Sequence, residues 1–152
     1  MGSQSKSVFR IVSNKYPPFD GTGAYKWGSR WVEPGRYVVH AAGQYSLAVL
    51  ENLVHWNVAR LPPTLACVVA TIPDSVSQSE VNPRKLDDQD YCRKIGNKWY
   101  DKAEVAVLWV PSVISPYEKN VLINQTHQDF SKIKITKTHD ANIDARLLKP
   151  TS

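Results

Sequence analysis

The sequence predicts an α+β fold: a single compact domain with a mixed β-sheet core and a few helices. The chain has 152 residues, a length that suits one domain. Several short apolar or alternating runs have the length of strands, whereas one segment has clear helical periodicity. Hydrophobic residues make up 42% of the chain and charged residues 22%, which is an ordinary globular composition.

Strands are predicted where β-branched and apolar residues run together between Pro, Gly and Asp residues. The predicted strands are, in order, 8–12, 37–42, 64–72, 105–110, 120–124 and 132–137. The last of them alternates Lys with Ile or Thr, which indicates a strand exposed on one face.

The clearest helix is predicted from Leu47 to about Val58, because apolar residues recur along it at helical spacing. Ser46 is a suitable N-cap residue directly before it. The Pro-Pro pair at 62–63 prevents the helix from continuing further.

Residues 1–7 are expected to form a flexible N-terminus, and residues 8–150 the domain. Residues 75–103 are polar and irregular, with a short helix expected near Tyr91. No stretch approaches the ~20 apolar residues of a membrane helix, and the N-terminus lacks the apolar core of a signal peptide. We therefore expect a cytoplasmic protein that does not contact a membrane.

The chain is basic, with a formal net charge of +5 and a pI of about 9.2. This balance suits a phosphate-bearing ligand, a nucleic acid or an acidic protein partner. The basic residues are scattered, however, and the densest group (Lys132, Lys134 and Lys137) is typical of the solvated side of a strand. Direct nucleic-acid binding is less favoured, because the charge is not gathered with stacking aromatic residues.

The cysteines do not indicate a metal site. Cys67, Cys92 and His40 lack the spacing of zinc ligands. Cys67 lies within an apolar run and is expected to be a buried small hydrophobic residue. The sequence also lacks a P-loop and a Gly-x-Gly-x-x-Gly motif.

Glu51 is the most informative candidate for a functional residue, because it falls on the apolar stripe of the predicted helix. An unpaired buried carboxylate is costly, so it requires a partner or a task. It is either a structural residue, in a salt bridge or at a partly exposed edge of the stripe, or a carboxylate that faces a cleft. Arg30, next to the small residues Gly28 and Ser29, is the predicted partner.

Ser112 directly follows a predicted buried strand, where a polar residue often lines a cleft at the edge of a sheet. The alternative is a simple turn serine, and the absence of Gly-x-Ser-x-Gly excludes a hydrolase nucleophile of that type. Arg10, Tyr16 and His40 are further polar groups among apolar neighbours, and each has a structural alternative.

Several segments occur in an order and spacing that resemble the RES-domain toxins of bacterial toxin–antitoxin pairs. The resemblance runs from about Phe9 to Leu148, nearly the whole chain. Its segments are Phe9-Arg10-Ile11, Gly28-Ser29-Arg30-Trp31, Gly35, Val38-Val39-His40-Ala41-Ala42, Ser46-Leu47-Ala48-Val49-Leu50-Glu51, Val110-Pro111-Ser112, Glu118-Lys119-Asn120-Val121-Leu122-Ile123-Asn124, His127-Gln128-Asp129-Phe130 and Asp144-Ala145-Arg146-Leu147.

The resemblance implies an ADP-ribosyltransferase-like fold and an enzyme that depletes NAD⁺ by cleaving its nicotinamide–ribose bond. Hydrolysis and phosphorolysis are both open, and inorganic phosphate would be a co-substrate in the second. NAD⁺ is the substrate, and no true cofactor or metal is implied. The alternatives are an ADP-ribosyltransferase that modifies a protein target and a catalytically impaired, nucleotide-binding member of the family.

The resemblance also implies partners: a cognate Xre-type helix-turn-helix antitoxin that blocks the active site, and a second copy of the chain in a homodimer. DNA would be contacted only through the antitoxin. The sequence itself does not reveal the oligomeric state.

The family is named after an Arg, a Glu and a Ser, which match Arg30, Glu51 and Ser112. The resemblance implies that Glu51 stabilises the charge on the ribose and that Arg30 grips the pyrophosphate or fixes Glu51. Ser112 would position the ribose or nicotinamide, and His40 would pack on the dinucleotide. The predicted nucleotide-binding residues are Arg10, Tyr16, Arg30, Trp31, His40 and Ser112.

Three positions depart from the family pattern. His40 stands where the family usually has Tyr, Val32 where it has Asn, and Asn97 where it has Asp. Only the first is among the predicted site residues. An imidazole can stack on a nicotinamide ring, although its donors and charge differ from those of a phenol.

Overall fold

The computed structural model describes residues 4–54 and 64–147. The strands are β1 (Lys6–Ser13), β2 (Val38–Ala42), β3 (Leu65–Ile72), β4 (Gln78–Glu80), β5 (Val107–Pro111), β6 (Lys119–Asn124) and β7 (Lys134–Asp140). The α-helices are α1 (Thr22–Trp27), α2 (Tyr45–Leu53) and α3 (Gln89–Lys102), and 3₁₀ turns lie at Gln128–Lys132 and Ala145–Leu147.

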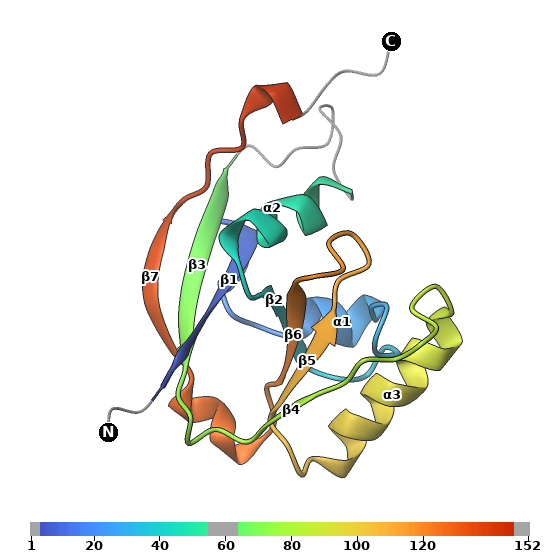
Figure 1. The fold of residues 1–152 in the computed structure, drawn as a ribbon. Coiled ribbons are helices and arrows are strands. Elements are labelled where there is room, and N and C mark those ends of the chain that lie inside the picture. Colours follow the sequence, from blue (N-terminus) through green and yellow to red (C-terminus); the bar gives the residue numbers. More distant parts are fainter. Residues whose placement is uncertain (1–3, 55–63, 148–152) are drawn as a thin grey trace.

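The strands form one seven-stranded sheet in the order β4-β5-β6-β2-β1-β3-β7 (Figure 1). The β4–β5 pair is parallel and the other pairs are antiparallel, so the sheet is mixed. The predicted α+β class is confirmed. Except for the last predicted strand, both the first and the last residue of each predicted strand lie within two residues of those observed.

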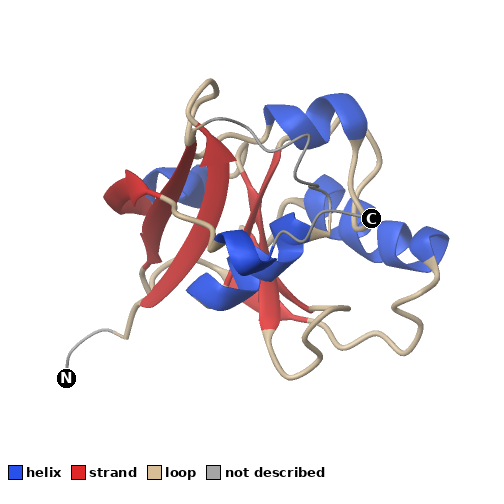
Figure 2. Cartoon of the chain, turned by 90° about the horizontal axis from the view of Figure 1, so that it is seen from above, coloured by secondary structure: helices blue, strands red, loops and turns tan. Residues whose placement is uncertain are grey.

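The sheet divides into two halves at the junction of β1 and β2, where a single pair, Phe9 and Ala42, is in register. By contrast, β1 pairs with β3 along its whole length. Figure 2 shows the two groups of strands diverging from each other. The main core fills the space between the halves, with Val8 and Ile72 from one side and Val107 from the other.

Helices cover the outer faces of this bent sheet. One further core joins α1 and α3 to the outer face of β2, β5 and β6, and Leu108, Leu122 and Trp99 are buried in it. Another joins α2 to β1 and β3 through Leu47 and Ile11. Because α2 follows β2 directly, it lies where the two halves of the sheet separate.

Helix α2 begins earlier and ends earlier than predicted. Gln44, in an extended conformation, is its N-cap, and the Ala48 amide bonds to the Gln44 carbonyl to complete the first turn. The prediction that Ser46 caps the helix is therefore wrong. Val54 is the C-cap and is 61% exposed, and the rest of the predicted helix lies outside the described residues.

Helix α3 is much longer than the short helix expected near Tyr91. The Asp88 side chain caps it by accepting the Tyr91 amide at 3.1 Å, and Ala103 ends it in the left-handed conformation with φ of 53°. Cys92 and Trp99 form a narrow buried stripe on an otherwise polar helix. So narrow a stripe explains why the segment resembles an irregular loop in the sequence.

Strand β7 lies at the edge of the sheet and is exposed at every residue. The prediction of one buried face is wrong here, because Ile135 is 44% exposed and β7 pairs with β3 alone. Lys132, expected to begin this strand, belongs to the preceding 3₁₀ turn. Among the described residues, no helix is both long and apolar enough to cross a membrane.

Candidate active site

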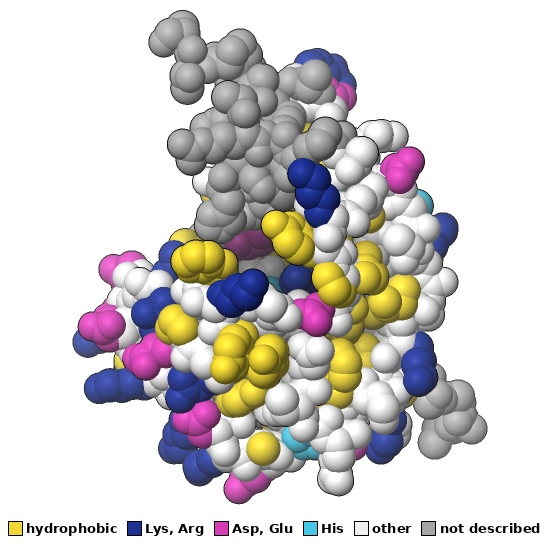
Figure 3. All heavy atoms as spheres, turned by 180° about the vertical axis from the view of Figure 1, so that it is seen from behind, with side chains coloured by type: hydrophobic (Ala, Val, Ile, Leu, Met, Phe, Trp, Pro, Cys, Tyr) yellow, Lys and Arg dark blue, Asp and Glu magenta, His cyan; other side chains and the backbone are white. Residues whose placement is uncertain are grey.

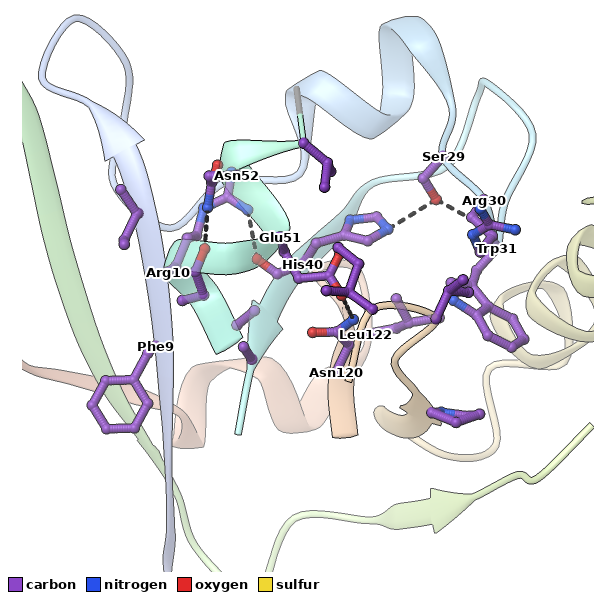
Figure 4. Close-up of a pocket in the computed structure, with 18 of the residues that line it drawn as sticks. Phe9, Arg10, Ser29, Arg30, Trp31, His40, Glu51, Asn52, Asn120 and Leu122 are labelled. Carbon is purple, nitrogen blue, oxygen red and sulfur yellow. Dashed lines mark hydrogen bonds between the residues drawn. The ribbon is translucent and has the colours of Figure 1, made fainter. Parts of the chain in front are cut away.

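A pocket of about 710 Å³ opens where the two halves of the sheet separate. Its walls come from β1, the segment 28–31, β2, α2 and the β5–β6 turn, and Figure 4 shows these side chains. On the face opposite to that of Figure 1, the surface is hollowed and apolar side chains border the hollow (Figure 3). The volume is that of a small-molecule site, ~300–1,000 Å³.

Glu51 projects from α2 into this pocket. Its Oε1 accepts hydrogen bonds from the Ser112 hydroxyl at 2.7 Å and from the Asn120 amide nitrogen at 2.8 Å. No Lys or Arg nitrogen among the described residues pairs with it. The prediction that Arg30 is its partner is therefore wrong, and two uncharged groups hold the carboxylate instead.

Ser112 follows β5 directly and is completely buried. Besides donating to Glu51, its hydroxyl oxygen accepts the amides of Ile114 at 3.1 Å and Ser115 at 3.0 Å. The pocket lining formed by the described residues does not include it. Ser112 thus lies behind Glu51, rather than facing a ligand as the resemblance implies.

Arg30 lies at the rim of the pocket and is exposed. Its Nη1 donates to the carbonyl of Leu86 at 2.8 Å, which fixes the side chain without neutralising it. The guanidinium keeps donors free to bind an anion that enters the pocket.

The segment that carries Arg30 is held closely against α3. A Cβ on Gly96 of α3 would lie 1.8 Å from the Trp31 carbonyl oxygen, so only glycine permits this contact. Gly28 has a φ of 71°, which favours glycine at the turn. The Nε of Arg93, also on α3, donates to the Ser29 carbonyl at 3.0 Å. Helix α3 therefore positions this wall of the pocket.

His40 projects from β2 toward the same wall. Its Nε2 lies 2.9 Å from the Ser29 hydroxyl, and its Nδ1 lies 3.3 Å from the Val38 carbonyl oxygen. Because a carbonyl can only accept, Nδ1 carries the hydrogen and Nε2 accepts from Ser29. Burial, followed by the nearby Arg10, lowers the pKa of His40 to about 4, so the ring is neutral at pH 7.

Arg10 places a positive charge at the inner wall. Its Nη1 donates to the His40 carbonyl at 2.7 Å and its Nη2 to the Asp20 carbonyl at 3.3 Å. Its Nε is buried and has no hydrogen-bond partner among the described residues. Burial lowers the pKa of Arg10 to about 10, and the Asp20 charge opposes that shift. The group remains cationic at neutral pH and can attract an anion.

The structure gathers most of the predicted site residues around one pocket. Those that line it are Arg10, Arg30, Trp31, His40 and Glu51. Tyr16 is 69% exposed and lies outside the lining, so the structure does not bring it to the site.

Ser29 and Asn120 were not among the site residues predicted from the sequence. Asn120 pairs with Ala42, which is two residues along β2 from His40, so its side chain faces the same side of the sheet as that of His40. Its position directly before the apolar residues 121–123, at the start of a predicted strand, is the sequence signal that could have identified it. Ser29 carries no such signal, because only the fold brings it to His40.

The three departures from the family pattern have different positions. Val32 is completely buried in the core beneath α3. Asn97 accepts the Glu33 amide at 3.0 Å through its side-chain oxygen, an acceptor that an Asp would also supply. Of the three, only His40 lines the pocket.

The described residues contain no group of three or more His, Cys, Asp or Glu side chains that could hold a metal ion. Cys67 and Cys92 are both free and completely buried, and burial raises the pKa of each thiol. The expectation that Cys67 is a buried small residue is confirmed.

Comparison with known proteins gives a consistent result. Residues 7–144 match the family model of the RES domain. The chain is 35% identical to a protein named Toxin Res from Photorhabdus laumondii, over 93% of this chain and 97% of that protein. It is 36% identical to a protein named Prs ADP-ribosylating toxin from Sphingobium sp., over 85% of this chain and 86% of that one.

The fold also matches a solved structure. A chain of the M. tuberculosis MbcT–MbcA toxin–antitoxin complex superposes with a TM-score of 0.75 at 12% identity, covering 91% of this chain and 85% of that one. The likeness supports the predicted architecture independently of sequence similarity. Taken with the family match over nearly the whole chain, these findings show that the protein belongs to the RES-domain family of toxins.

Proposed function

We propose that the protein is the toxin of a toxin–antitoxin pair and that it depletes NAD⁺ by cleaving the nicotinamide–ribose bond. One observation carries the proposal: an oriented carboxylate, Glu51, faces a pocket whose inner wall holds the incompletely bonded guanidinium of Arg10. A negative group beside a positive group suits a ligand that is cationic at one end and anionic at the other.

The chemistry requires stabilisation of positive charge. When the bond between the ribose carbon and the nicotinamide nitrogen breaks, the electron pair leaves with nicotinamide and positive charge develops on the sugar. A fixed carboxylate stabilises that charge without having to reorganise. Glu51 suits this role because its donors are neutral, so its own charge is not cancelled by a cation from the described residues.

The positive groups suit the remainder of the dinucleotide. Arg10 and Arg30 both line the pocket, and a guanidinium offers a planar set of donors to phosphate oxygens. In Figure 4, His40 stands between Glu51 and Arg30, and it lies diagonally across the β2–β6 pair from Asn120. Diagonal neighbours are roughly 7–8 Å apart, which leaves room for a sugar or a nicotinamide ring.

The acceptor of the ADP-ribose is water in a hydrolase and inorganic phosphate in a phosphorylase. A protein acceptor is the second candidate function, favoured by the relative named Prs ADP-ribosylating toxin. The apolar side chains Val54, Val113 and Ile114, which line the pocket and are exposed, would suit contact with such a protein.

We also propose an antitoxin partner, because the fold matches a chain of a toxin–antitoxin complex. The family resemblance suggests an Xre-type helix-turn-helix protein, a homodimer of the toxin within the assembly, and contact with DNA through the antitoxin alone. Co-expression with the product of a neighbouring helix-turn-helix gene, followed by co-purification, tests the pairing.

The catalytic proposal is tested by incubating the purified protein with NAD⁺, with and without phosphate, and identifying the products by mass. Release of nicotinamide is the expected result. Free ADP-ribose identifies a hydrolase, and ADP-ribose 1″-phosphate identifies a phosphorylase. Nicotinamide release only in the presence of a protein that becomes modified supports the second candidate, whereas intact NAD⁺ under all these conditions contradicts both.

A further inference from the structure

We infer that Ser112 is a positioning residue that acts only through Glu51, and that Asn120 holds the same carboxylate from the pocket wall: together they hold its Oε1 and leave Oε2 to the substrate. This inference rests on the proposed function, because it assigns roles within the same site. It differs from the role that the family resemblance implies for Ser112, which is direct contact with ribose or nicotinamide.

The bonding of Ser112 leaves no group for a substrate. A hydroxyl has one hydrogen to donate and two lone pairs that accept. The hydrogen goes to Glu51, and the lone pairs receive the amides of Ile114 and Ser115. The side chain is also completely buried, outside the pocket lining formed by the described residues. A ligand would therefore have to break existing bonds in order to contact it.

Asn120 supplies the second donor, from the other end of the β5–β6 turn. It lies on β6, in register with Val110 of β5 and Ala42 of β2, so two neighbouring strands fix its backbone. Its Nδ2 donates to the same Glu51 oxygen that Ser112 uses, at 2.8 Å. Both ends of the β5–β6 turn thus contribute one donor to one carboxylate.

Two donors on one oxygen determine the orientation of the carboxylate. Rotation about the last side-chain bond of Glu51 would break both bonds, and hydrogen bonds to a charged group are among the stronger ones. The other oxygen, Oε2, accepts no hydrogen bond from the described residues, while Glu51 lines the pocket. Since both donors are neutral, they orient the carboxylate and preserve its charge.

A double-mutant cycle tests whether Ser112 acts through Glu51. The measured rate is nicotinamide release by the wild type, Ser112→Ala, Glu51→Gln and the double variant. Loss of a hydrogen bond to a charged group is expected to lower kcat about 10-fold to 100-fold in Ser112→Ala, with little change in KM. In the Glu51→Gln background, Ser112→Ala should cause no further loss, because residues that act as a unit are not additive.

Ser115→Ala is the matched control. This serine lies in the same turn, and its hydroxyl donates to Glu118 at 2.9 Å instead of Glu51. The Ser115→Ala variant should release nicotinamide at the wild-type rate. Because Ser112 also anchors the turn, Asn120→Leu provides a second variant that removes the other donor without changing those turn contacts. It should repeat the kcat loss and the lack of additivity with Glu51→Gln.

A raised KM with unchanged kcat, or full additivity with Glu51→Gln, would overturn the inference and favour direct substrate contact. A wild type that releases no nicotinamide would contradict the proposed function instead. The inference is then decided by NMR on the ligand-free protein, where the side-chain amide signal of Asn120 should shift in Glu51→Gln and in Ser112→Ala. An unchanged amide signal in both variants would refute it.

Discussion

The Nε2 of His40 lies 2.9 Å from the hydroxyl of Ser29, and this contact orients the ring of the one pocket residue that departs from the family pattern. Burial, followed by the nearby Arg10, lowers the pKa of His40 to about 4, so the imidazole is neutral at pH 7. Its opposite ring nitrogen, Nδ1, faces the Val38 carbonyl and therefore carries the hydrogen. A neutral aromatic ring can pack against a cationic nicotinamide, whereas an imidazolium would repel it.

His40→Tyr is expected to remain active. A phenol also offers an aromatic face, and its hydroxyl can bond to a neighbouring serine. Nicotinamide release by the purified variant should stay within about 10-fold of the wild-type rate, a change of ~1.4 kcal/mol in the barrier. A folded but inactive variant would show that the imidazole has a role that a phenol cannot fill.

The same residue predicts how stability depends on pH. The imidazole of the unfolded chain titrates near its usual pKa of 6.5, whereas in the folded protein its pKa is lowered to about 4. Between these values the unfolded state binds more protons, so stability falls as the pH falls from about 6.5 to about 4. His40 contributes up to ~3 kcal/mol to this loss.

Urea unfolding of the wild type and His40→Tyr at both ends of this range measures the contribution. Asp20, Asp129 and Asp144, whose pKa values are lowered by their hydrogen bonds, also lose stabilisation in acid. They are present in both proteins, so the difference between the two isolates His40. Parallel pH profiles for the two proteins would contradict an imidazole whose pKa is lowered in the folded protein.

Arg10→Lys is expected to weaken the binding of ADP-ribose about 10-fold or more. Lysine keeps the charge and loses the planar set of donors that suits phosphate oxygens. Arg36→Lys is the matched control, because Arg36 forms its paired hydrogen bonds with Asp101 and does not line the pocket. Calorimetric titration with ADP-ribose measures the affinity of each variant and of the wild type. If Arg10→Lys bound ADP-ribose as tightly as the wild type does, Arg10 would be excluded from phosphate binding.

Gly96→Ala is expected to destabilise the protein by about 1–3 kcal/mol or more, the cost of overpacking. The added Cβ would lie 1.8 Å from the Trp31 carbonyl oxygen and would push the segment 28–31 away from α3. Gly23→Ala is the control, since a Cβ there meets nothing within 4 Å and α1 gains ~0.5–1 kcal/mol from alanine. Denaturant unfolding should show a lower free energy of unfolding for Gly96→Ala and a higher one for Gly23→Ala.

Local patterns predicted the strands well, because β-branched runs bounded by turn residues are legible without tertiary information. They also placed Glu51 on the buried side of its helix, where the structure confirms that it faces a pocket. The partner of Glu51 was not predictable in this way. Arg30 is near in sequence, but the donors come from Ser112 and Asn120, which only the pairing of β2 with β6 brings alongside α2.

Other errors have similar physical causes. Whether β7 has a buried face depends on what covers the edge of the sheet. The alternation of Lys with Ile or Thr along the strand carries no information about that cover. Helix α3 was underestimated because its buried stripe is narrow. A tyrosine has an aromatic ring and a hydroxyl that can bind a nucleotide, but the fold places Tyr16 on the exposed surface. Residue type indicated the chemistry of the site, and long-range register determined which residues take part.

Glu51→Gln tests the central claim most directly. The change keeps the size of the side chain and can keep the bonds from Ser112 and Asn120, but it removes the charge. The variant should fold as the wild type does and lose NAD⁺ cleavage by ~10²–10⁴-fold, measured as nicotinamide release by equal amounts of folded protein. Nicotinamide release at close to the wild-type rate would contradict the account, because the carboxylate would then have no part in breaking the bond.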